Sequence, residues 1–76
     1  MKKVFSRKEL LKDGMHTIRL TINLAEEAIV YGDRKKARRF LARASIEASF
    51  LADLGLISYE KEDLLRDIII RTYNNF

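Results

Sequence analysis

Apolar residues recur along this chain at helical spacing in three separate stretches. The first series is Leu11, Met15, Ile18, Ile22, Ala25 and Ile29, and the second is Ala37, Leu41, Ala44, Ala48 and Leu51. The third stretch carries Leu64, Leu65, Ile68, Ile69, Ile70 and Tyr73. Alternating steps of three and four residues place side chains on one face of a helix, and no stretch alternates as a strand does. The pattern therefore predicts three amphipathic helices.

Residues at the ends of these stretches predict where each helix begins and ends. Ser6 followed by Glu9 forms a capping box, and Phe5 with Leu10 is spaced as a hydrophobic staple. Each of the next two helices is preceded by a residue that commonly caps a helix N-terminus, namely Asp33 and Ser58.

Two glycines are placed to end the first two helices. Gly32 and Gly55 can adopt the positive φ of a C-terminal cap, and Leu56 is placed for the apolar contact that accompanies such a cap. The connections between helices are therefore short, and short connections favour antiparallel neighbours.

The predicted fold is all-α, a single domain over residues 1–76 built as a three-helix up-down-up antiparallel bundle. We expect helices at roughly residues 7–31, 34–54 and 59–74. Gly14 interrupts the first series and costs about 1 kcal/mol relative to alanine inside a helix. It leaves two alternatives, one continuous helix or a separate short N-terminal helix before Gly14.

Composition argues against most chemistry. The chain has 76 residues, no cysteine and a single histidine, His16, which excludes disulfides, thiolate sites and the usual catalytic pairs. We expect a non-enzymatic protein with no cofactor, no metal and no membrane-spanning segment. Residues 1–5 resemble the basic start of a signal peptide, but charged residues follow where its apolar segment belongs. We therefore expect no export and a cytoplasmic location.

The connection between the first two helices resembles the hairpin of a tetratricopeptide repeat. The residues that carry the likeness are Leu24, Ala25, Gly32, Ala37, Leu41 and Ala44. The small residues among them let two antiparallel helices approach closely. The resemblance covers residues 21–44 only, less than one repeat of about 34 residues, and Thr21 stands where the motif has an aromatic residue. By analogy, it implies protein–protein binding.

A cluster of basic residues opens the second helix. It consists of Arg34, Lys35, Lys36, Arg38, Arg39 and Arg43. The helix dipole disfavours cations in a first turn, and the free N–H groups there favour an anion. Lys36, Arg39 and Arg43 also share a face. The cluster therefore predicts an anionic partner, either phosphates or an acidic protein surface. The alternative is a solvated basic face.

A surplus of apolar and small residues nominates a second surface. Ile68, Ile69 and Ile70 together span about 200° of a helix, more than one neighbouring helix pair readily covers. A stripe of small residues lies beside the main series of the second helix. The resulting candidate interface is Ala42, Ser45, Ser49, Ala52, Ile69, Ile70 and Tyr73. These residues belong either to an ordinary core or to an interface with a partner or a second copy.

Two function classes follow from these features. The first is a small adaptor, inhibitor or regulator that binds another protein and acts as a homodimer. The alternative is an accessory protein that contacts DNA or RNA backbone through the basic N-terminal half of the second helix. A helix-turn-helix around Gly55 is rejected because its recognition helix would begin with the acidic residues Glu60, Glu62 and Asp63.

Overall fold

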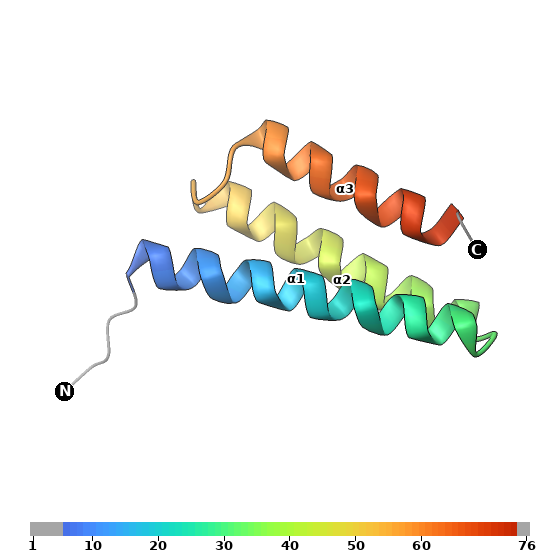
Figure 1. The fold of residues 1–76 in the computed structure, drawn as a ribbon. Coiled ribbons are helices and arrows are strands. Elements are labelled where there is room, and N and C mark those ends of the chain that lie inside the picture. Colours follow the sequence, from blue (N-terminus) through green and yellow to red (C-terminus); the bar gives the residue numbers. More distant parts are fainter. Residues whose placement is uncertain (1–5, 75–76) are drawn as a thin grey trace.

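The protein is a bundle of three antiparallel helices. The computed structural model describes residues 6–74, which contain α1 (Arg7–Val30), α2 (Arg34–Asp53), α3 (Tyr59–Asn74) and no strand (Figure 1). These bounds differ by at most one residue from those expected from the sequence. None of the three described helices is long and apolar enough to cross a membrane.

The predicted N-terminal caps are present. Side-chain oxygens of Ser6, Asp33 and Ser58 each accept a hydrogen bond from the backbone N–H three residues later, at 3.1, 3.0 and 3.0 Å. Each bond satisfies one of the N–H groups that a helix start leaves unpaired. The staple predicted with Phe5 lies outside the described residues.

Both connections turn on glycine, as expected. Gly32 and Gly55 have φ of +83° and +72°, a region that other residues rarely adopt. In both turns the N–H of the next residue donates to the carbonyl five residues before it, at 2.8 and 2.9 Å, which is the bond of a Schellman cap. Leu56 packs against the core beyond the second turn, as the motif predicts.

Gly14 lies inside one uninterrupted helix, so no separate short helix precedes it. The reason for glycine is a close contact with α2. A Cβ at position 14 would lie 2.6 Å from Cδ2 of Leu51, a side chain that is only 2% exposed. The missing side chain thus makes room for a large core residue, and this packing outweighs the weak helix propensity of glycine.

The helix α2 lies between the other two. It contacts both α1 and α3, while α1 and α3 touch each other only slightly (Figure 1). The Cα atoms span 45 × 29 × 13 Å, so the bundle is flat. Its buried apolar core is Ile18, Ile22, Ala25, Ala28, Ile29, Ala37, Leu41, Ala44, Ala48, Leu51, Leu65 and Ile69. Its alanines allow the close helix approach expected from the hairpin pattern, since Ala25 and Ala37 are fully buried.

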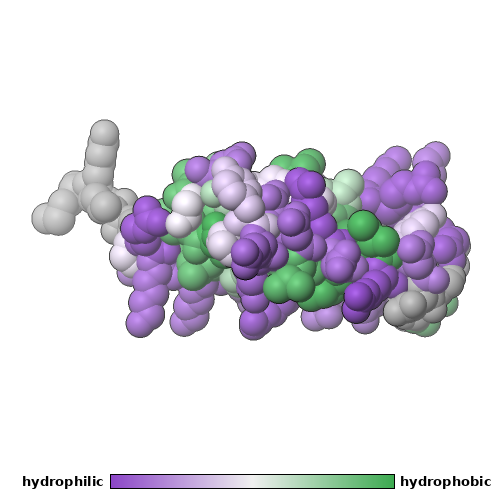
Figure 2. Space-filling model, turned by 90° about the horizontal axis from the view of Figure 1, so that it is seen from above, coloured by the Kyte–Doolittle hydropathy of each residue, from purple (hydrophilic) through white to green (hydrophobic). Residues whose placement is uncertain are grey.

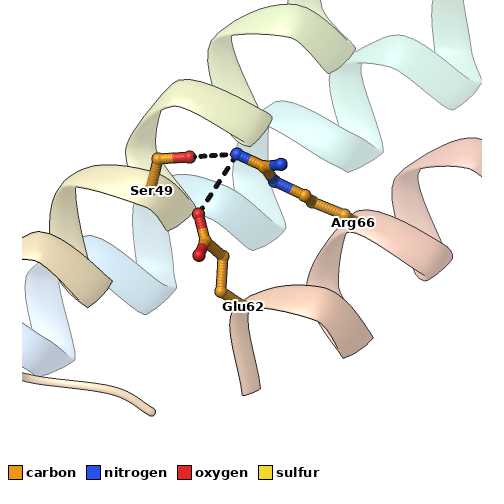
Figure 3. A network of polar contacts seen from close by, with 3 residues as sticks. All are labelled: Ser49, Glu62 and Arg66. Atoms are coloured by element: carbon orange, nitrogen blue, oxygen red, sulfur yellow. Dashed lines mark hydrogen bonds and ion pairs between the residues drawn. The ribbon is translucent and has the colours of Figure 1, made fainter. Parts of the chain in front are cut away.

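A polar network joins the N-terminal half of α3 to the C-terminal half of α2 (Figure 3). Glu62 is buried, and its carboxylate forms an ion pair of 3.2 Å with Arg66, four residues later on the same helix. The guanidinium of Arg66 donates a hydrogen bond to Oγ of Ser49, 2.5 Å away. The network thus links the two helices through polar side chains, in addition to the apolar core that they share.

Candidate binding site between α2 and α3

A groove runs between α2 and α3 at the end of the bundle where α2 begins. Its volume is about 290 Å³, and its lining is mostly apolar. The lining residues are Arg38, Leu41, Ala42 and Ser45 from α2, and Ile69, Ile70, Tyr73 and Asn74 from α3. In a view from the α3 side, green apolar side chains come to the surface between purple polar ones (Figure 2).

The three consecutive isoleucines are not covered alike. Ile69 is buried in the core, whereas Ile68 and Ile70 are 48% and 56% exposed. Since Ile70 lines the groove, the structure brings together five members of the predicted apolar interface there. The remaining two lie elsewhere. Ser49 bonds Arg66, and Ala52 is buried beneath the helix surface.

Two arginines hold Tyr73 at one end of the groove. The guanidinium of Arg38 donates to the Tyr73 hydroxyl at 2.9 Å, and that of Arg34 donates to the Tyr73 carbonyl oxygen at 3.2 Å. Both guanidinium carbons also lie over the tyrosine ring, 4.8 Å from its centre for Arg34 and 5.6 Å for Arg38. Such cation–π contacts add to the hydrogen bonds. The start of α2 is thus tied to the end of α3.

The same contacts change the acidity of Tyr73. The hydrogen bond from Arg38 lowers the pKa of the Tyr73 hydroxyl, with a smaller contribution from Arg34, because the cations favour the phenolate. The pKa of Arg38 is raised by the reciprocal interaction, so this residue stays charged. The groove therefore ends in a permanent positive charge.

Removing Arg38 is expected to raise the pKa of Tyr73. In a background with Tyr31→Phe and Tyr59→Phe, phenolate absorbance reports Tyr73 alone, and Arg38→Met should move its titration to higher pH. A folded-state pKa below the unfolded one gives stability that is present at high pH and lost as pH falls through the folded pKa. The stability difference between the parent and Arg38→Met should therefore grow as pH rises through the tyrosine range. An unchanged titration would contradict the contact.

The other four residues of the basic cluster are not engaged with Tyr73 as Arg34 and Arg38 are. Lys35, Arg39 and Arg43 are exposed on α2 and make no ion pair with any acidic side chain in residues 6–74. Lys36 lines a separate hollow between α1 and α2, together with Phe40. The predicted basic cluster is therefore two groups, one engaged with Tyr73 and one facing solvent.

Sequence reasoning missed two large apolar residues on α2. Ile46 and Phe50 are 70% and 55% exposed, although they lie on the central helix. Their signal was present in the sequence. They are four residues apart and fall two positions after Ala44 and Ala48, on the opposite side of the helix from the core.

Comparisons with known proteins assign this chain to no family. No protein-family model, no curated protein and no solved structure matches this chain. The tetratricopeptide-like hairpin therefore stays a local likeness. Within residues 6–74, no group of three acidic or histidine side chains is placed to hold a metal ion.

Proposed function

We propose that this protein acts without catalysis, as an adaptor or regulator that binds another protein through the groove between α2 and α3. The ligand we propose is a segment that presents a large apolar side chain next to an acidic one. The apolar side chain fills the space beside Ile70, and the acidic side chain lies near Arg38.

The observation that supports this proposal most is the groove itself, an apolar channel that ends in a fixed cation. Burying a large aliphatic side chain in such a site contributes about 1.5–3 kcal/mol. A guanidinium has five N–H donors, and the described contact with the Tyr73 hydroxyl uses one donor of Arg38. A carboxylate is the natural partner for such a fork.

The test is selection of peptides from a displayed random library on the wild-type chain. We expect the selected peptides to combine an aromatic or aliphatic residue with a nearby Asp or Glu. Ile70→Glu should weaken their binding about 10–100-fold, because it places a carboxylate in the apolar channel and repels the peptide's own acid.

Leu64→Glu is the matched control for this substitution. Leu64 is also on α3 and is 60% exposed, close to the exposure of Ile70, but it lies outside the groove. Peptide affinity should survive this change. Selected peptides that bind wild type and Ile70→Glu equally well would overturn the proposed site.

We further propose that the protein acts as a homodimer. Twelve large apolar residues are at least about two-fifths exposed in the described chain, ten of them on the helices. A chain of this length buries little surface by itself, and self-association is one way such proteins gain stability.

A second candidate function is binding to DNA or RNA. It is favoured by the exposed cations Lys35, Arg39 and Arg43, for which the described residues offer no acidic partner. Contacts of this kind bind phosphates without reading sequence.

A further inference from the structure

The central helix α2 carries a second periodic series on the side away from the core. We call it the outer seam, and it consists of Arg39, Arg43, Ile46, Phe50 and Asp53. It repeats the steps of four, three, four and three that define the buried series, displaced by two residues. Two residues correspond to about 200° around a helix, so the two series lie on opposite sides of α2.

Nothing in residues 6–74 covers this outer seam. The neighbours of α2 pack on its other side, where Ala44, Ala48 and Leu51 are buried. Ile46 and Phe50 are the two central residues of the seam, and both are more than half exposed. Heptad-like spacing of this kind is typical of a helix that packs against another helix.

We propose that the outer seam pairs with the outer seam of a second copy, with the two α2 helices antiparallel about a twofold axis. This inference gives the proposed homodimer its interface. When Ile46 faces Phe50 of the second copy, the same register places Arg43 opposite Asp53 of the second copy. A twofold axis repeats each contact, giving two apolar and two ionic contacts from one helix pair.

Charge selects both the occupant and its direction. The described part of α2 up to Arg43 has six basic residues and no acid, while the part that follows has Glu47 and Asp53 and no basic residue. A parallel pair would set like charges against each other, whereas an antiparallel pair sets the basic half toward the acidic half. The outer seam is thus complementary in charge to the same seam running in the opposite direction, as an antiparallel second copy presents it.

Sedimentation equilibrium at micromolar concentration tests the interface. The wild-type chain should be a dimer, and Ile46→Glu should raise the dissociation constant roughly 100-fold, because the substitution acts on both copies. Leu64→Glu, at an apolar position on α3 that is 60% exposed against 70% for Ile46, should leave the dimer unchanged. Far-UV circular dichroism checks that each variant keeps its helices.

A charge exchange tests the register. Arg43→Asp and Asp53→Arg should each weaken the dimer, because each places like charges opposite one another. Combining the two substitutions should restore dimerisation, since it exchanges the partners without changing the composition. A combined variant that dissociates as readily as the single ones would overturn the register.

Disulfide formation tests the direction. The chain has no cysteine, so introduced thiols are unique. A mixture of Arg43→Cys and Asp53→Cys chains should form a mixed disulfide on mild oxidation, while neither variant should cross-link to itself. Self-linking of Arg43→Cys would indicate a parallel pair and overturn the inference.

The outcomes separate this inference from the proposals on which it rests. A wild-type chain that remains monomeric at high concentration would overturn the homodimer and its interface together. A wild-type dimer that survives Ile46→Glu would overturn the interface alone. Peptide binding in the groove depends on Ile70, so neither result bears on that site.

Discussion

Leu51→Ala is expected to destabilise the fold by about 2–5 kcal/mol, the usual cost of removing a fully buried leucine and leaving a cavity. Leu51 is 2% exposed and packs against the backbone of α1 at Gly14. Native proteins have net stabilities of about 5–15 kcal/mol, so the loss is a large fraction of the total. Urea unfolding followed by circular dichroism measures it.

The sign of a second substitution then tests the contact itself. Gly14→Ala alone should destabilise, because overpacking costs about 1–3 kcal/mol and exceeds the gain of about 1 kcal/mol in helix propensity. In the Leu51→Ala background the obstructing side chain is gone, so the same change should stabilise by up to about 1 kcal/mol.

Gly32→Ala is the control for this pair. Alanine is unfavourable at position 32 because the backbone φ there is positive, and an added Cβ would meet no neighbouring atom. The cost of Gly32→Ala should therefore be the same in the wild-type and Leu51→Ala backgrounds. A Gly14→Ala effect that is also the same in both backgrounds would show that Leu51 does not restrict position 14.

The fold was largely predictable because its determinants are local. Ser6, Asp33 and Ser58 cap helices through bonds to residues three positions away, and Gly32 and Gly55 act within single turns. Gly14 was the ambiguous position, since local propensity allows a break there. The contact between Gly14 and Leu51 explains why the helix continues there. It joins residues far apart in sequence, so the spacing of apolar residues does not predict it.

The candidate site was predictable only in part, because it depends on how α3 is rotated against α2. Spacing grouped Ser49 and Ala52 with Ala42, yet Ser49 is bonded to Arg66 and Ala52 is buried in the core, so neither lines the groove. The capture of Tyr73 by Arg38 was likewise out of reach, since it joins residues 35 positions apart. Helix registry, rather than composition, decides which charges face solvent.

The engagement of Arg34 and Arg38 with Tyr73 leaves four residues of the basic cluster, Lys35, Lys36, Arg39 and Arg43. Of these, Lys36, Arg39 and Arg43 share one face of α2, so they are the residues to test together for nucleic-acid binding. For this second candidate function, reversing all three to glutamate should abolish binding to any duplex. Surface changes usually cost within about 0.5 kcal/mol each, so the fold should survive. Wild-type affinity should fall with salt at a logarithmic slope of about −2.7, the value for three phosphate contacts at about −0.9 each.

A matched variant separates this effect from bulk charge. Lys8, Lys12 and Arg19 are exposed on one side of α1, and reversing them changes the net charge by the same amount. This control should keep most of the nucleic-acid affinity, because the contacts of α2 are intact. If both triple variants lose binding equally, the wild-type attraction is the non-specific effect of a chain with net charge +4, and α2 is not a nucleic-acid site.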